Sequence, residues 1–420
     1  MTGILLPRGS PHPVEADALM SNPSPGGRSV SSLGRILRLL PLVCLVVVLA
    51  LASPAFALDG YPDNYNPLLV ISDFNWRNSA SMSQSEIQTF LVSKNSVLAN
   101  YACEEGGPNG LHSTVVKPAS QIIAEAAQYW NINPKLILAT LEKEQSLITQ
   151  AWHEGTYNGP YPMPPGTTHG TGYHLINAMG VGCYPGSPDT HPGFGDQVWT
   201  GTQKLGQTTG PYAWTPGKVK SVWSYVHSAY IDIVPVNQPT WNFYTYTPYY
   251  PQYSIWRIYN QWFGDPRIDA VDGRIHRFYN KKNGSHFYTA SATEAQRVAR
   301  DLPTTYVFEG AAYSLDTTSG ANGQPLFRFY RPSNGTHFYT VSPEERDLVI
   351  RTLAKTYKYE GPAYMVSIDP TNRWPIYRFY NKQGGSHCYT IDPGERDWVM
   401  NTLGWKYTYE GVAYYVALAY

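Results

Sequence analysis

Charged residues are scarce in this sequence. Asp, Glu, Lys and Arg make up 15% of the 420 residues, and 31 basic side chains balance 31 acidic ones. Such a sparse and balanced charge gives no electrostatic basis for binding nucleic acid or an anionic membrane. We expect no cofactor. Tyrosine, in contrast, is abundant at 34 residues, with 12 Trp, a composition that suits sugar-facing or peptide-facing surfaces as well as small β-rich cores.

The sequence also lacks an apolar run long enough to span a bilayer as a helix. Its apolar run at residues 39–52 is shorter than the ~20 residues that a spanning helix needs. Arg35 and Arg38 precede this run, and Ala55-Phe56-Ala57 follows it. This order predicts a secretory signal peptide over residues 1–57, cleaved after Ala57; an uncleaved anchor is the alternative. Met20 is an alternative start, which would make residues 1–19 an extra segment. We therefore expect a secreted protein, extracellular or associated with the cell wall, with no membrane association after cleavage.

Cysteine is the third scarce residue type, with four in the chain. One lies in the apolar run, which leaves Cys103, Cys183 and Cys388. Export favours oxidation, and Cys103 and Cys183 fall in the same expected domain, so we predict a disulfide between them. Cys388 stands at a position that Phe287 and Phe338 occupy in related segments. We expect it to be a buried, unpaired thiol.

The C-terminal third of the chain contains three copies of one motif. They align on His286, His337 and His387, which are spaced by 51 and 50 residues. Each copy reads Arg-Phe-Tyr, a glycine turn, Ser or Thr, His, Phe or Cys, and Tyr-Thr, and then a Glu eight residues after the His. Fifteen residues further on, each copy has Glu-Gly-x-Ala-Tyr. Such self-similarity at a fixed period indicates a repeat architecture.

Within each copy, the local signals predict a hairpin, a short helix and a final strand. The helices should begin at the caps Ser291, Ser342 and Asp392, with the Glu three residues later completing a capping box. We expect repeats at 274–316, 325–368 and 375–418 in a domain spanning 272–420, packed about one axis or stacked in a row. The three matched histidines allow either a threefold metal site or, without clustered ligand spacing, a local hydrogen bond in each hairpin.

The segment 58–266 is expected to form a separate domain, and one of its helices contains a notable carboxylate. Asn133 and Pro134 are typical of a helix start, and the helix is expected to run to Ile148. Ile137, Leu141 and Ile148 lie on one face, and Glu144 falls on the same stripe. Burial there would favour the neutral carboxyl that a general acid needs; a partly buried Glu in a distant salt bridge is the alternative. Glu142 is expected to face Lys135 and solvent.

The residues around this helix resemble the lysozyme-like, lytic transglycosylase superfamily. The similarity rests on three segments: Asn133-Pro134 to Glu144-Gln145-Ser146, Ala178-Met179-Gly180-Val181-Gly182-Cys183, and Tyr244-Thr245-Tyr246-Thr247-Pro248. It implies a mainly α lysozyme-like domain with Glu144 as the catalytic residue. It also implies substrate contacts by Ser146, Met179, Gly180, Tyr244 and Tyr246. Gln145, inserted between Glu144 and Ser146, departs from the superfamily pattern, as does the absence of its Gln after the glycine turn.

The repeats resemble an uncharacterised family found at the C-termini of secreted bacterial and fungal proteins, which implies an adhesion or wall-binding role. The expected fold is therefore multidomain: a mainly α lysozyme-like domain, then a β-rich α+β domain of three pseudo-symmetric repeats. The expected function is that of a peptidoglycan-cleaving glycosidase or lytic transglycosylase whose repeats bind peptidoglycan or another cell-surface glycan. A non-catalytic adhesin on a lysozyme-like scaffold is the alternative.

Overall fold

The computed structural model describes residues 60–62, 64–108, 114–149, 174–182, 193–315 and 323–416. All of these belong to one compact unit that spans residues 41–420. The predicted signal peptide, residues 1–57, lies outside the described residues. Within the described ranges, no helix combines the length and apolarity that crossing a membrane requires.

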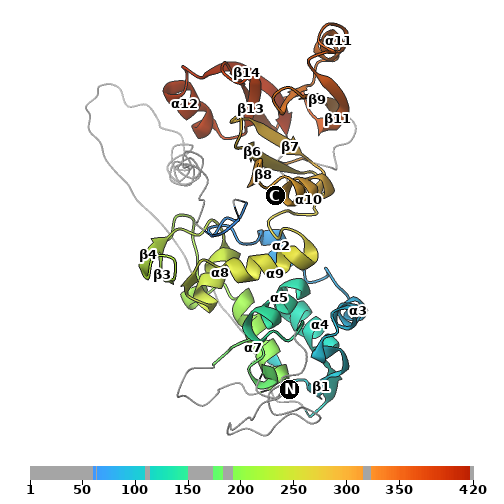
Figure 1. The fold of residues 1–420 in the computed structure, drawn as a ribbon, viewed down its shortest axis with the longest axis vertical. Coiled ribbons are helices and arrows are strands. Elements are labelled where there is room, and N and C mark those ends of the chain that lie inside the picture. The colour runs from blue at the N-terminus through green and yellow to red at the C-terminus, as the bar shows by residue number, and fades with distance from the viewer. Residues whose placement is uncertain are drawn as a thin grey trace, which may run out of the picture. The chain divides into compact units, whose positions relative to one another are not determined.

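The described residues between 60 and 266, called here the helical region, fold mainly into α-helices joined by short strands and 3₁₀ turns (Figure 1). Its helices are α2 (Asp73–Arg77), α3 (Gln84–Ser93), α4 (Ala119–Trp130), α5 (Pro134–Gln145), α7 (Phe194–Gly206), α8 (Gln238–Tyr246) and α9 (Tyr253–Phe263). Its 3₁₀ helices are η2 (Val97–Asn100) and η4 (Gly210–Tyr212), and its strands are β1 (Ala102–Glu104), β2 (Val116–Pro118), β3 (Lys220–Ser224), β4 (Ala229–Ile233) and β5 (Tyr249–Tyr250).

Helix α5 begins where the sequence predicted and ends earlier. The side chain of Asn133 accepts a hydrogen bond from the backbone N–H of Lys135, and Pro134 occupies the first turn. The helix stops at Gln145 because Ser146 adopts a left-handed conformation with φ 55°, which an α-helix cannot continue through. The expected extension to Ile148 is therefore wrong. The apolar face of α5 is confirmed for Ile137 and Leu141, which are 0% exposed; Ile148 is also buried but lies beyond the end of the helix.

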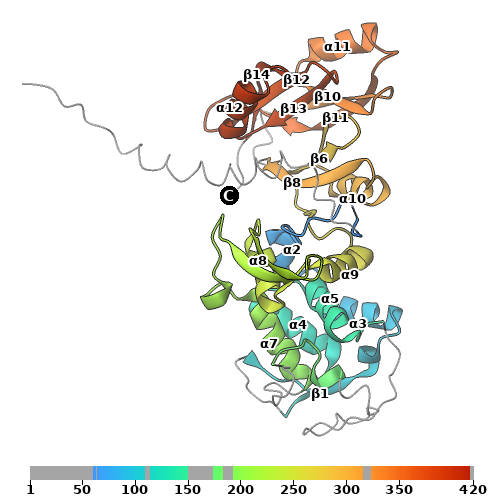
Figure 2. The same cartoon turned by 60° about the vertical axis from the view of Figure 1, so that its left-hand side comes forward.

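Residues 274–416, called here the repeat region, form three small antiparallel sheets (Figure 2). The first unit contains β6 (Arg274–Asn280), β7 (His286–Thr289), α10 (Ala292–Asp301) and β8 (Tyr306–Ser314). The second contains β9 (Gln324–Arg331), β10 (Thr336–Thr340), α11 (Pro343–Thr352) and β11 (Lys358–Val366). The third contains β12 (Trp374–Asn381), β13 (Ser386–Thr390), α12 (Pro393–Thr402) and β14 (Tyr407–Val416). In each unit the first strand lies between the other two, so each sheet pairs a hairpin with the strand that follows the helix.

Three buried tyrosines connect the units in a closed cycle. The hydroxyl of Tyr339 donates to the carbonyl of Tyr288 at 3.0 Å, and that of Tyr389 donates to the carbonyl of Tyr339 at 2.9 Å. The hydroxyl of Tyr288 donates to the carbonyl of Tyr389 at 2.8 Å, which returns to the first unit. A second buried group, Tyr313, Tyr364 and Tyr414, joins its hydroxyls at 2.6–3.4 Å. Each unit therefore satisfies buried polar groups of the next one.

Ion pairs also cross the unit boundaries, and they correct one expectation about the helices. Ser291, Ser342 and Asp392 cap α10, α11 and α12 as predicted. The glutamates Glu294, Glu345 and Glu395, however, are not explained by capping boxes. Their carboxylates face the arginine of another unit in three pairs: Glu294 with Arg328 at 3.0 Å, Glu345 with Arg378 at 3.6 Å, and Glu395 with Arg277 at 3.6 Å.

Candidate functional site

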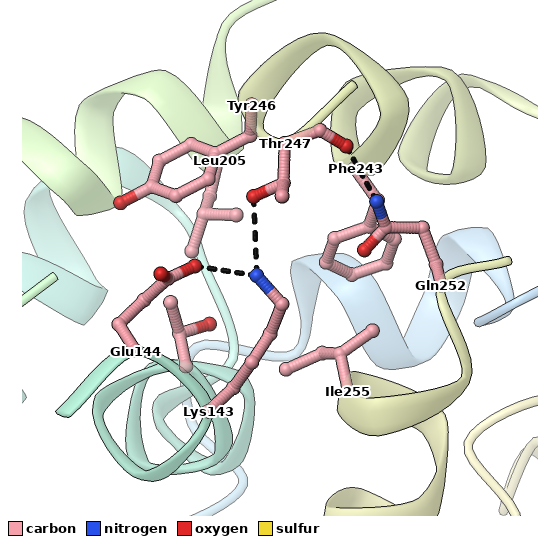
Figure 3. A pocket seen from close by; sticks show the side chains of 9 residues that line it. Lys143, Glu144, Leu205, Phe243, Tyr246, Thr247, Gln252 and Ile255 are labelled. Atoms are coloured by element: carbon pink, nitrogen blue, oxygen red, sulfur yellow. Dashed lines mark hydrogen bonds and ion pairs between the residues drawn. The ribbon is translucent and has the colours of Figure 1, made fainter. Parts of the chain in front are cut away.

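The carboxylate of Glu144 lies in a small pocket at the C-terminal end of α5 (Figure 3). Lys143 Nζ is 2.5 Å from Glu144 Oε1 and 3.1 Å from Thr247 Oγ1. The two side chains are 16% and 21% exposed, so the ion pair is mostly but not fully removed from water. The pocket is lined by Thr140, Lys143, Glu144, Leu205, Phe243, Tyr246, Thr247, Gln252 and Ile255. Helices α5, α7, α8 and α9 all contribute to this wall.

The pairing with Lys143 changes the expected electrostatics of Glu144. Partial burial agrees with the helical stripe on which the sequence places this residue. An ammonium group in contact, however, stabilises the ionised carboxylate and not the neutral acid. The sequence analysis considered burial alone and missed this pairing, since Lys143, its neighbour in sequence, turns toward the same pocket. The Glu144 carboxylate is therefore paired with the Lys143 ammonium group, which also contacts the hydroxyl of Thr247.

The turn at residues 177–182 lies directly beside the Glu144 carboxylate. Gly180 has φ +70°, and a Cβ atom at this position would lie 3.2 Å from Glu144 Oε2. The hydroxyl of Tyr246 donates to the backbone carbonyl of Met179 at 2.5 Å. Two of the predicted site residues, Gly180 and Tyr246, are thus brought together with Glu144.

Gln197 holds this turn in place and was not recognised as a site residue from the sequence. It is 0% exposed. Its side-chain oxygen accepts hydrogen bonds from the backbone N–H groups of Met179 and Val181, at 3.1 and 3.0 Å. Its amide donates to the carbonyl of Val181 at 2.8 Å. The glycine turn itself was the available signal, since its backbone groups need a hydrogen-bond partner.

Three predicted substrate contacts do not reach the pocket. Tyr244 is 0% exposed, and its hydroxyl donates to the carbonyl of Pro67 at 3.0 Å, so it is a core residue. Met179 is also 0% exposed, and its side chain packs against Gly201 of α7. Ser146 forms the C-cap of α5 and is not among the residues that line the pocket. Burial and helix termination explain these residues without a ligand.

Glu142 has a structural role that the sequence did not indicate. Its carboxylate accepts hydrogen bonds from the backbone N–H groups of Ile148 and Thr149, at 3.0 and 3.1 Å. The expectation that it faces solvent holds in part, since its bonds with Thr149 are exposed, but these backbone partners were not expected. The reason is the left-handed turn at Ser146, which reverses the chain and brings those two N–H groups to Glu142.

The predicted disulfide joins Cys103 and Cys183. Cys183 lies outside the described residues, so its disulfide with Cys103 stays a prediction. Burial raises the pKa of the Cys103 thiol to about 11.

The three repeat histidines each face the second Glu of their own unit. The pairs are His286 with Glu309 at 3.3 Å, His337 with Glu360 at 3.7 Å, and His387 with Glu410 at 3.3 Å. In the part of the chain that the structure describes, no three His, Cys, Asp or Glu residues group as metal ligands.

The pocket is small in this conformation. Its volume is about 10 Å³, which is room for about one water molecule. A sugar ring or a peptide does not fit inside, so a substrate must approach the partly exposed edge of Glu144 or separate Lys143 from it. The site can donate or accept one proton at Glu144, and Lys143 can supply a positive charge.

Two family models match parts of this chain. Residues 70–164 match the model described as LasA, N-terminal domain, and this match includes α5 with Glu144. Residues 274–417 match a domain of unknown function, DUF5648, over the three units of the repeat region. No curated protein and no solved structure matches the chain. The chain thus combines a segment similar to the LasA N-terminal domain with a C-terminal domain of unknown function.

Proposed function

We propose that this is a secreted protein that acts on the cell wall and cleaves peptidoglycan, with Glu144 as its acid/base residue. The observation that carries the proposal is the position of Glu144, which lies at the C-terminal end of α5 and keeps 21% of its side chain exposed between Lys143 and the Gly180 turn. The match of residues 70–164 to the LasA N-terminal domain supports an exported, wall-active protein. The signal-peptide pattern favours the same location.

The proposed reaction is cleavage of the bond between N-acetylmuramic acid and N-acetylglucosamine on a lysozyme-like scaffold. Glu144 would protonate the glycosidic oxygen and then accept a proton from water or from the 6-hydroxyl of the sugar. In the structure the carboxylate is paired with Lys143. Substrate would have to displace Lys143 Nζ from Glu144, and Thr247 Oγ1, already 3.1 Å from this ammonium group, would remain as its partner.

The repeat region would hold the enzyme on the wall or on another surface glycan. Its three pseudo-symmetric units join through buried tyrosines. A non-catalytic adhesin is the second candidate, because the pocket volume of about 10 Å³ leaves no room for a sugar ring in this conformation.

A turbidity assay on purified cell walls tests the proposal. Wild type should clear the suspension, and Glu144→Gln should not, because the amide keeps the shape and cannot transfer the proton. Glu104→Gln is the control, since Glu104 is exposed on β1 and should clear walls like wild type.

Product analysis separates the candidates. New reducing or anhydro sugar ends indicate glycan cleavage, whereas new free amino groups indicate a peptidase. Equal clearing by wild type and Glu144→Gln would exclude Glu144 as the acid. Binding to walls without any release of products, in both proteins, would leave the adhesin.

A further inference from the structure

The sheet of β4, β3 and β5, whose first two strands are labelled in Figure 1, carries a row of aromatic side chains on one face. Tyr230 of β4 and Tyr249 of β5 both stand opposite Trp223 of β3. Residues directly opposite each other in neighbouring strands place their side chains on the same face. Tyr225 extends the row, because its ring lies 5.2 Å from that of Tyr249, between centroids. These four residues are called here the aromatic face.

The opposite face of this sheet packs into the protein. Val222 and Ser224, which alternate with Trp223 along β3, are 0% exposed. Val222 belongs to a buried cluster with Tyr244 of α8 and Tyr250 of β5. Because successive side chains of a strand point to opposite faces, the aromatic face points away from this cluster and toward solvent.

The rings of the aromatic face are open to solvent. Tyr230 is 72% exposed, Tyr225 66% and Tyr249 43%. The rings of Trp223 and Tyr230 lie 5.3 Å apart at 77°, a cross-strand contact that stabilises the hairpin and still leaves most of Tyr230 exposed. A sheet with one buried face usually presents polar side chains on the other. Contiguous exposed apolar side chains at this place indicate a binding surface.

The aromatic face is continuous with the wall of the Glu144 pocket. Thr247 and Gln252 both line that pocket. The carbonyl of Thr247 accepts from the backbone N–H group of Tyr249 at 2.8 Å. The side-chain amide of Gln252 donates to the carbonyls of Thr247 and Tyr249, at 2.5 and 2.9 Å. The segment 247–252 thus forms part of the pocket wall and the β5 edge of the aromatic face.

The chemistry of this surface fits a glycan strand. The pocket volume of about 10 Å³ does not admit a sugar ring, so the affinity for a polymeric substrate has to come from surfaces beside it. The C–H groups of a pyranose ring pack against the face of an aromatic ring, which is slightly negative. Ser221 and Asp232, exposed and paired in register on the same face, can hydrogen-bond to sugar hydroxyl or amide groups.

We propose that the aromatic face binds the glycan strand of the cell wall by stacking and holds it beside the Glu144 pocket. The identity of the glycan rests on the proposed function. The site itself is an addition to it, because it gives the helical region a binding surface of its own, apart from the repeat region. Tyr225 and Tyr230 provide the most exposed rings, so they should contribute most to the affinity.

The test is isothermal titration calorimetry of the full chain carrying Glu144→Gln, which should not cleave, with a soluble hexamer of β-1,4-linked N-acetylglucosamine. Tyr225→Ala and Tyr230→Ala, each added to this background, should weaken binding at least about fivefold, as expected when an aromatic anchor is truncated. Tyr225→Phe keeps the ring and should bind like the background protein. Tyr129→Ala is the matched control, since Tyr129 is 57% exposed on α4, and it should leave the affinity unchanged. Thermal melts verify that each variant folds.

Equal affinities of the background protein, Tyr225→Ala and Tyr230→Ala overturn the proposal, and so does a background protein that does not bind the hexamer. Tighter binding of a hexamer of β-1,4-linked glucose would assign the face to another glycan and would equally overturn it. So would self-association in light scattering, or binding to phosphatidylcholine vesicles, that Tyr230→Ala abolishes while the hexamer still binds.

The wall-clearing assay reports separately on the proposed function. A wild-type protein that binds the hexamer through the aromatic face and clears no walls would lose the enzymatic proposal and keep this binding site. A protein that clears walls with unchanged activity and affinity in both alanine variants would keep the enzymatic proposal and lose the binding site.

Discussion

The carboxylate of Glu144 lies against the backbone of Gly180, where a Cβ atom would stand 3.2 Å from Oε2. Gly180 also has φ +70°, a left-handed conformation that residues with a Cβ rarely adopt. Glycine therefore meets two requirements at once: it forms the turn, and it leaves room for the candidate catalytic side chain.

Gly180→Ala separates these two requirements. The left-handed backbone should cost about 1–2 kcal/mol of stability, and the added methyl group should displace the Glu144 carboxylate and reduce wall-lytic activity. Gly217→Ala is the matched control, since Gly217 has φ +80° and no heavy atom lies within 4 Å of the position that its added methyl group would take. It should show the loss of stability in a thermal melt and keep full activity. Equal activity of the two variants would contradict a close functional contact at Gly180.

Glu142→Ala should destabilise the protein without removing activity. The carboxylate accepts from the backbone N–H groups of Ile148 and Thr149, and its loss leaves the turn after α5 without these acceptors. We expect a decrease of about 1–2 kcal/mol in the free energy of unfolding, measured by denaturant titration. Glu104→Ala, at an exposed position of β1, should change it little. A Glu142→Ala variant as stable as wild type would show that these hydrogen bonds contribute nothing.

Tyr339→Phe should weaken the closed cycle of repeat units. The hydroxyl donates to the carbonyl of Tyr288 and accepts from its N–H group, both at 3.0 Å, in a buried position. Its removal leaves two buried backbone groups unpaired, and we expect a loss of about 1–3 kcal/mol in a thermal melt. Tyr380→Phe is the control, because Tyr380 is 37% exposed. The closed cycle would not be important for stability if both variants melted like wild type.

His276 should make the repeat region sensitive to acid. It is 0% exposed, and burial lowers its pKa to about 4 from an ordinary 6.5. Above pH 6.5 the side chain is neutral in the folded and unfolded states, so its contribution to stability is complete there. As the pH falls from 6.5 toward 4, only the unfolded state binds the proton, and stability decreases by as much as about 3 kcal/mol.

His276→Phe should remove this part of the pH dependence, because Phe327 occupies the matched position in the second unit. The measurement is the free energy of unfolding at several pH values between 4 and 8. The wild-type curve should fall more steeply on the acidic side than that of the variant. Parallel curves would show that His276 is not responsible.

The sequence by itself determined the features that depend on short segments. The start of α5 follows from Asn133 and Pro134, since capping is local to the first turn. The buried face of that helix follows from the spacing of Ile137 and Leu141, because side chains four residues apart lie on one side. The same reasoning places a strand, turn and helix in each repeat, where the glycine turn and the cap lie within a few residues of the strands they join.

Only the tertiary structure decided which of these residues meet. Tyr244 and Tyr246 belong to one short motif, yet they point to different sides of α8 because two residues turn an α-helix by about 200°; the first is buried in the core and the second contacts Met179. Thr247 reaches Lys143 across 104 residues of sequence, a distance over which no local pattern specifies a partner. Closure of the three units likewise brings Tyr288 to Tyr389, since contacts between the ends of a repeat array arise from packing and not from the motif that each unit repeats.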